Sequence, residues 1–104
     1  MTSRGRGKHR AAFSFDIEDW HHSELNPTGK ARPAESIVER GTSAILDLLA
    51  RHGWRSTFFV LGDVVREHPE LIRRMVREGH ELACHGMSHR PVWRATPETF
   101  RAEL

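Results

Sequence analysis

Three short apolar segments, each followed by a segment of helical character, constrain the fold of this chain more than any other feature. The apolar segments cover residues 11–17, 57–61 and 81–84, and their length and composition predict β-strands. The segments that follow predict helices over residues 36–51, 63–78 and 96–104. Strands that alternate with helices predict an α/β fold with a parallel sheet, either doubly wound or part of a barrel.

Local signals set the expected bounds of the first helix. Ser36 and Glu39 have the spacing of a capping box, in which the serine side chain caps the helix N terminus. Gly53 is expected to end this helix, because glycine readily adopts the left-handed conformation that follows a last helical turn. Gly41 lies inside the helix and weakens its helical propensity.

Composition excludes several classes of protein. The 104 residues contain 16 Lys+Arg and 14 Asp+Glu, so a net charge of +2 says little about partners. No apolar run approaches the roughly 20 residues of a membrane span, and we find no apolar stretch typical of a secretory signal. Cys84 is the single cysteine, which excludes an internal disulfide and suits a reducing compartment. We therefore expect a cytoplasmic protein without a membrane span.

The chain divides into two parts. Residues 1–10 are predicted to be a flexible basic leader, and residues 11–104 are predicted to form the folded part. The leader carries four cationic side chains, Arg4, Arg6, Lys8 and Arg10. A nucleic-acid-binding arm is one interpretation, but no aromatic side chain is interleaved with these charges before Phe13. We favour a solubilising leader and expect no nucleic-acid partner.

Polar residues that suit metal chemistry follow two of the predicted strands. Asp16, Glu18 and Asp19 lie at the end of the first strand, and His85 and His89 follow the third. The carboxyl ends of parallel strands share one rim of a sheet, so these groups are expected to meet there. Two histidines and a carboxylate leave coordination positions of a divalent ion open to water and substrate. A second carboxylate can then act as general base.

The motifs also resemble a known family. The segments at residues 15–19 (Phe-Asp-Ile-Glu-Asp), 56–62 (Ser-Thr-Phe-Phe-Val-Leu-Gly) and 79–89, which ends in His85-Gly-Met-Ser-His89, are similar to the N-terminal portion of polysaccharide deacetylases. These are the NodB-homology domains of carbohydrate esterase family 4. The resemblance covers residues 11–104, and it implies the first three or so βα units of an irregular (β/α) barrel.

The resemblance also implies site roles. An Asp-His-His triad holds zinc or a similar ion in that family, and a neighbouring aspartate is the base. Carried over, His85, His89 and Asp19 are the metal ligands and Asp16 is the catalytic base. The family's commonest motif has two adjacent aspartates, whereas this chain has Asp-Ile-Glu-Asp. Strand alternation places Asp16 and Glu18 on one face, so Glu18 remains open as ligand or base.

The implied activity is metal-dependent removal of N-acetyl groups from an amino-sugar polysaccharide or oligosaccharide, of the exopolysaccharide or peptidoglycan type. A water activated by the ion would attack the acetamide carbonyl. The Asp-Ile-Glu-Asp form also resembles cyclic-amide hydrolases of the allantoinase type, which is one alternative. The family's arginine motif and general-acid histidine do not occur in residues 1–104. A truncated, inactive fragment is therefore a second alternative.

Overall fold

The structure is a computed structural model that describes residues 9–22 and 36–104. It contains the strands β1 (Ser14–Ile17), β2 (Thr57–Val60) and β3 (Glu81–Cys84), the helices α1 (Val38–His52), α2 (Gly62–Glu67), α3 (Pro69–Arg77) and α4 (Pro97–Glu103), and the 3₁₀ turns η1 (Trp20–His22) and η2 (Val92–Arg94). Most of the predicted basic leader, residues 1–8, lies outside the described residues.

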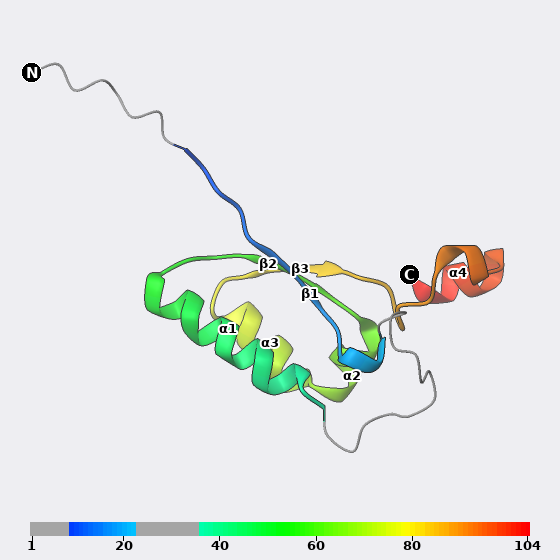
Figure 1. Cartoon of the computed structure of the whole chain (residues 1–104), viewed down its shortest axis with the longest axis horizontal. Helices are drawn as coiled ribbons and strands as arrows, with labels where there is room; N and C mark the ends of the chain where they lie inside the picture. Colours follow the sequence, from blue (N-terminus) through cyan, green and yellow to red (C-terminus); the bar gives the residue numbers. More distant parts are fainter. Residues whose placement is uncertain (1–8, 23–35) are drawn as a thin grey trace, which may run out of the picture.

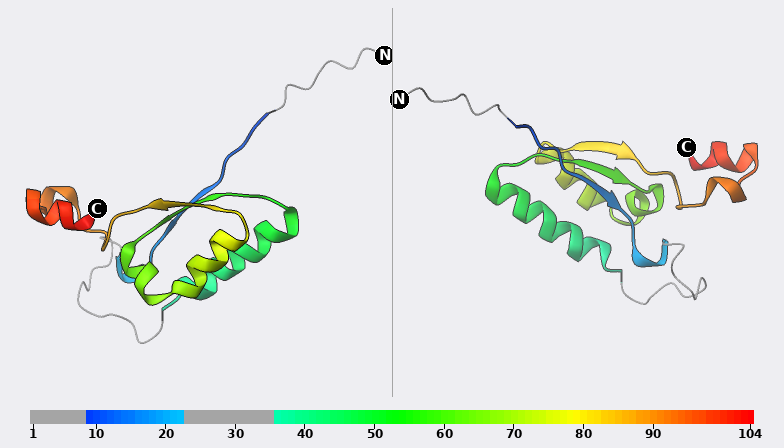
Figure 2. Two further views of the ribbon diagram at one scale, coloured as in Figure 1. Left: turned by 180° about the vertical axis from the view of Figure 1, so that it is seen from behind. Right: turned by 45° about the horizontal axis from the view of Figure 1, so that its top comes forward.

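The three strands form one parallel sheet in the order β1-β2-β3. Ile17 pairs with Val60, and Val60 pairs with Cys84, so the three strands end at the same level. Helices α1 and α3 lie side by side against one face of this sheet, as the views in Figures 1 and 2 show. The structure thus confirms the predicted α/β fold with a parallel sheet.

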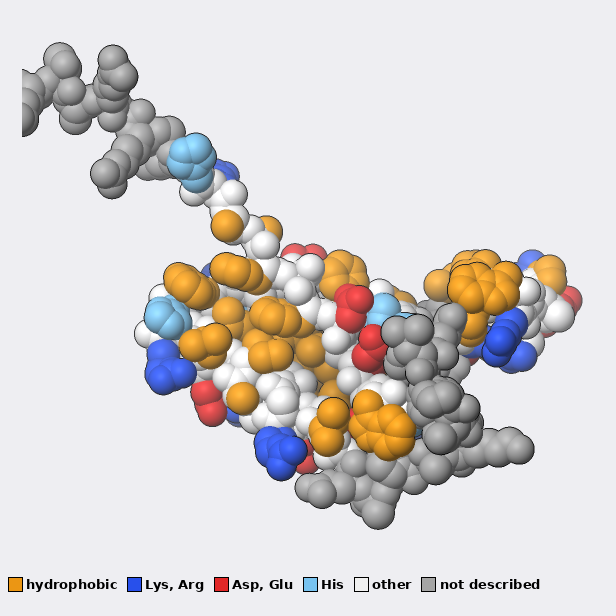
Figure 3. All heavy atoms as spheres, viewed as in Figure 1, with side chains coloured by type: hydrophobic (Ala, Val, Ile, Leu, Met, Phe, Trp, Pro, Cys, Tyr) orange, Lys and Arg blue, Asp and Glu red, His pale blue; other side chains and the backbone are white. Residues whose placement is uncertain are grey.

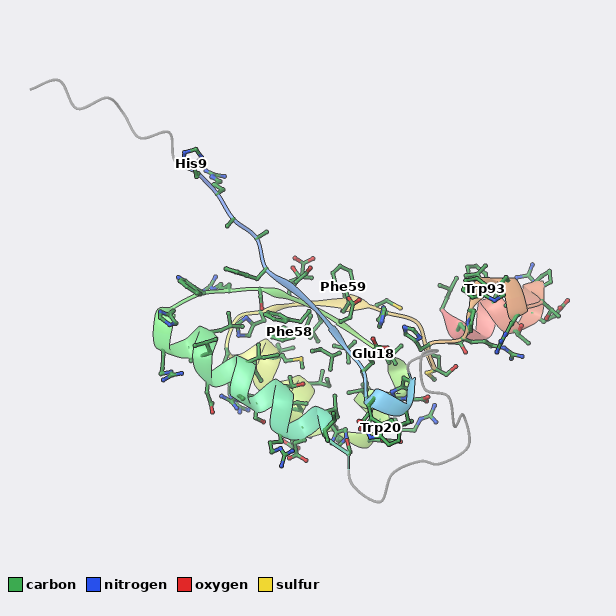
Figure 4. The ribbon with its side chains drawn as sticks, in the orientation of Figure 1. His9, Glu18, Trp20, Phe58, Phe59 and Trp93 are labelled. Atoms are coloured by element: carbon green, nitrogen blue, oxygen red, sulfur yellow. The ribbon has the colours of Figure 1, made fainter. Side chains whose placement is uncertain are left out.

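The hydrophobic core lies between the sheet and these two helices. Phe58 at the centre of β2 is fully buried, as are Leu46 of α1 and Met75 of α3. Figure 4 shows Phe58 directed towards the helices, whereas its neighbour Phe59 lies on the opposite face of the sheet. This alternation is the ordinary period of a strand, and burial of such side chains contributes roughly 1.5–3 kcal/mol each.

The predicted capping box at the start of α1 is wrong. The helix begins at Val38, its N-cap position is Ile37, and no side chain caps it there. Ser36 instead donates its hydroxyl hydrogen to a carboxylate oxygen of Asp19, which lies two residues after the end of β1. A tertiary partner has therefore replaced the local one that the spacing predicted.

Two glycines of α1 give a test of the local structure. Gly53 is the C-cap with φ 64°, and Gly41 lies inside the helix; a Cβ added at either would meet no atom within 4 Å. We expect Gly53→Ala to lower the free energy of unfolding by about 1 kcal/mol, because alanine disfavours the left-handed conformation. Gly41→Ala is expected to raise it by roughly 0.5–1 kcal/mol. Urea denaturation of both variants measures the difference, and equal shifts would contradict the C-cap assignment.

None of the helices in the described part of the chain has the length and apolar character needed to cross a membrane.

Candidate metal centre

The sheet brings one carboxylate and one histidine to the same level at the ends of β1 and β3. The backbone N–H of Leu61 donates to the carbonyl of Ile17, and that of His85 donates to the carbonyl of Val60, so the parallel pairing continues just past the strands. Glu18 therefore follows β1 where His85 follows β3. Figure 4 shows Glu18 at this end of the sheet, beyond the core.

Glu18, His85 and His89 form a cluster in which each offers one ligand atom, and these atoms all lie within 4.8 Å of one another. Oε2 of Glu18 is 3.1 Å from Nε2 of His89 and 3.8 Å from Nε2 of His85. The ligand atoms of a tetrahedral zinc ion, at about 2.0–2.2 Å from the metal, are spaced by roughly 3.4 Å. In Figure 3, acidic and histidine side chains lie next to each other at the surface in this region.

Unsatisfied atoms at the cluster indicate that it suits a divalent cation. Oε2 of Glu18 and Nε2 of His85 are buried, yet neither has a hydrogen-bond partner among the described residues. Although Nε2 of His89 is close to Oε2 of Glu18, their geometry is not that of a hydrogen bond. Leaving buried polar atoms unpaired costs free energy, and a shared ion would satisfy both atoms.

Asp16 lies beside this cluster, on the same face of β1 as Glu18. Its Oδ2 atom is 3.9 Å from Nε2 of His85, and its side chain is 61% exposed, whereas that of Glu18 is 28% exposed. An exposed carboxylate next to the three potential ligands can reach both water and a bound substrate. This position suits the predicted role of general base.

The structure does not bring Asp19 to the two histidines. Asp19 is 2% exposed and accepts hydrogen bonds from the hydroxyl of Ser36 and from the backbone N–H groups of Trp20 (2.9 Å) and Ile37 (3.4 Å). Both carboxylate oxygens are therefore used between η1 and the start of α1. The cluster contains Glu18 in the place that the resemblance implied for Asp19.

Electrostatics agree with a charged Asp19. Burial by itself would raise the pKa of this carboxyl group, but the hydrogen bonds from Ser36, Trp20 and Ile37 outweigh it and hold the pKa below its ordinary value. A carboxylate that accepts several hydrogen bonds is stabilised in its ionised form. Asp19 therefore acts in the structure as a buried anion that connects the end of β1 to α1.

His22 is a neighbour of the site whose role the sequence did not reveal. Its Nδ1 atom accepts a hydrogen bond from the backbone N–H of Asp19 at 2.9 Å, and its Nε2 atom lies 3.8 Å from Oδ2 of Asp63. Burial and the nearby His21 lower the pKa of His22. The only signal in the sequence is the pair His21-His22 directly after the acidic residues, which is more typical of a solvated loop than of a functional site.

Comparison with known proteins agrees with the family resemblance of the sequence motifs. The polysaccharide deacetylase family model matches residues 5–104. A chitooligosaccharide deacetylase of Bradyrhizobium is 48% identical over 63 residues, which cover 61% of this chain and 29% of that protein. The peptidoglycan-N-acetylglucosamine deacetylase PgdA of Listeria monocytogenes is 44% identical over 57 residues, or 55% of this chain and 11% of the relative.

Solved structures show the same fold. The peptidoglycan deacetylase PdaC from Bacillus subtilis superposes with a TM-score of 0.65 at 30% identity, over 88% of this chain and 37% of that one. A putative polysaccharide deacetylase from Mycobacterium smegmatis gives the same TM-score and identity over 88% and 34%. The chain thus spans about a third or less of the length of these relatives. Because the family model matches nearly all of it, the chain belongs to the polysaccharide deacetylase family.

Proposed function

We propose that this chain supplies the metal ligands and the general base of a hydrolase that removes N-acetyl groups from an amino-sugar polymer. The observation that carries the proposal is the cluster of Glu18, His85 and His89, in which Oε2 of Glu18 and Nε2 of His85 are buried without a hydrogen-bond partner among the described residues. Nitrogen and carboxylate ligands of this kind suit zinc, and we propose zinc as the ion. The assignment replaces Asp19 with Glu18 as the carboxylate ligand.

The side chains of the site have two proposed roles, binding of the ion and transfer of a proton. A bound zinc ion would polarise a carbonyl oxygen and lower the pKa of water. Glu18, His85 and His89 would hold the ion, and Asp16 lies beside them, with its Oδ2 atom 3.9 Å from Nε2 of His85. The Asp16 carboxylate would take the proton from the water that attacks the acetamide carbonyl carbon. Cleavage of the carbon–nitrogen bond then gives acetate and a free amine on the sugar.

The class of substrate is inferred from the relatives. The relatives described above include a chitooligosaccharide deacetylase, a peptidoglycan-N-acetylglucosamine deacetylase and a peptidoglycan deacetylase. We propose an N-acetylated amino-sugar polymer or oligomer as the substrate of the full-length protein.

The test is release of acetate by the full-length protein, including any residues beyond these 104. Purified protein is incubated with N-acetylchitooligosaccharides, with peptidoglycan fragments and with a hydantoin-like cyclic amide, and acetate and ring-opened products are measured by mass spectrometry. We expect acetate from at least one amino-sugar substrate, loss of this activity after treatment with a chelator, and recovery with added zinc. Ring opening without release of acetate would contradict the proposal and favour a cyclic-amide hydrolase.

A further inference from the structure

The loop that joins the two histidines is held on one side by the N terminus of α2. The backbone N–H groups of Gly62 and Asp63 donate to the carbonyl oxygens of Gly86 and Met87, each at 2.9 Å. The contact is close, since a Cβ added at Gly62 would lie 3.3 Å from the Cα atom of Met87. This side of the loop therefore uses backbone contacts that the sequence pattern does not reveal.

A single side chain, Glu103 at the end of α4, holds the other side of the loop. Its Oε2 atom accepts hydrogen bonds from the backbone N–H groups of Met87 at 3.0 Å and of Ser88 at 2.8 Å. Its Oε1 atom accepts a hydrogen bond from the hydroxyl of Ser88. Three donors from two consecutive residues thus converge on one carboxylate, and hydrogen bonds to an ionised acceptor are among the stronger ones in proteins.

Apolar side chains lie near this contact. Glu103 lines an apolar cavity of about 370 Å³ between β3, α2 and α4, together with Val65, Leu82 and Met87. Burial tends to raise the pKa of Glu103, but the hydrogen bonds from Ser88 and Met87 outweigh it, so the pKa lies below its ordinary value. The charged form of Glu103 is therefore the form that fits the loop.

The conformation of the loop requires such support. Gly86 has φ 88° and His89 has φ 66°, and His89 is the one non-glycine residue with positive φ in the described part of the chain. A residue other than glycine rarely adopts this backbone conformation, and the conformation persists where surrounding contacts hold it in place. The direction of the His89 ring thus depends on how firmly the preceding residues are held.

We propose that Glu103 is a positioning residue for the metal site, which fixes the loop at Met87 and Ser88 and thereby the position of His89. The inference rests on the proposed function, because His89 is a ligand only if the cluster binds a metal. Glu103 is not among the three residues of the cluster. It acts through the loop, in the way that outer partners orient the ligands of other metal sites.

The test combines zinc affinity with hydrogen exchange in the full chain. Glutamine at position 103 keeps the size of the side chain but replaces one acceptor oxygen with an NH₂ group, which opposes the donors of the loop. We expect Glu103→Gln to weaken zinc binding about 10-fold in a calorimetric titration, within the range found for outer partners of metal ligands. In the metal-free chain, we expect faster exchange of the amide hydrogens of Met87 and Ser88.

Two further variants separate positioning from a general loss of structure. Glu98→Gln changes an exposed glutamate in the first turn of the same helix, and we expect it to alter neither readout. Ser88→Ala removes only the hydroxyl donor and is expected to have a smaller effect than Glu103→Gln. The unfolding midpoint of each variant, measured in urea, checks that the fold is retained.

The outcomes are distinct. Faster exchange with unchanged zinc affinity, or no change in either readout, would overturn the positioning role of Glu103. Failure of the unmodified chain to bind zinc would overturn the proposed function, and with it the role of Glu103 in metal binding. Zinc binding by the unmodified chain together with a normal affinity of Glu103→Gln would leave the proposed function intact and refute only this inference.

Discussion

Changing Glu18 to glutamine is expected to lower zinc affinity by more than about 100-fold, beyond what the loss of an outer partner costs. Oε2 of Glu18 is the atom that lies near both histidine Nε2 atoms, at 3.1 Å and 3.8 Å, and it has no other partner among the described residues. Glutamine keeps the shape of the side chain but removes its charge. Competition with a chromophoric chelator on the full chain measures the affinity.

Changing Asp16 to asparagine is the matched test of the other carboxylate. Asp16 is more exposed than Glu18 and lies at the edge of the cluster, so we expect zinc affinity to be retained. Loss of a general base is expected to lower the kcat of the full-length protein by about 10²–10⁴-fold. Asp47→Asn, an exposed carboxylate on α1 that pairs with Arg74, serves as the control and should change neither quantity.

The opposite pattern would restore the assignment that the family resemblance implied. If Asp19→Asn abolished zinc binding in a folded protein while Glu18→Gln retained it, Asp19 would be the ligand. If Asp16→Asn lost zinc affinity as well as activity, Asp16 would belong to the metal ligands. Circular dichroism and urea denaturation of each variant ensure that affinity is compared between folded proteins.

Replacing Asp19 with alanine is expected to lower the free energy of unfolding by about 2–4 kcal/mol. The variant leaves the hydroxyl of Ser36 and the backbone N–H groups of Trp20 and Ile37 without their acceptor, in a region where Asp19 is 2% exposed. Buried donors that lose their acceptor account for most of the effect. Urea denaturation measures it as a lower midpoint with an unchanged slope.

Two further variants allow the loss of stability in Asp19→Ala to be compared with smaller changes. Ser36→Ala removes one of the three donors and should cost less than Asp19→Ala. Asp47→Ala removes an exposed carboxylate of the same type from α1, and because its ion pair with Arg74 is at the surface we expect a loss below about 1 kcal/mol. A loss for Asp19→Ala no larger than that for Asp47→Ala would show that the buried network does not stabilise the fold.

The parallel sheet and the place of the histidines could be predicted because they depend on patterns within short segments. The apolar runs fixed β1, β2 and β3 to within a few residues, and the alternation with helices indicated parallel pairing. Parallel pairing in turn brings the ends of β1 and β3 to one rim. His85 follows directly on β3, so its place followed from the sequence.

The choice between Glu18 and Asp19 needed the tertiary structure. Strand alternation puts Asp16 and Glu18 on one face, yet it does not reveal what faces the residue after them. The chain turns at η1, directly after Asp19, and the start of α1 supplies Ser36 and Ile37 as donors for the Asp19 carboxylate. These donors are 17 and 18 residues away in the sequence, so no local pattern could indicate them.

The amino-acid sequence by itself thus determined the α/β topology, the family resemblance and a rim that gathers histidines and carboxylates, because strand and helix periods and adjacent motifs are local properties. The tertiary structure decided which carboxylate joins the histidines and which one binds to α1. It also brought Glu103 to the loop between the histidines, although 15 residues separate it from Ser88. Those contacts depend on how distant segments pack. A buried carboxylate is stabilised in its charged form by hydrogen-bond donors, and here the donors come from segments far away in the sequence.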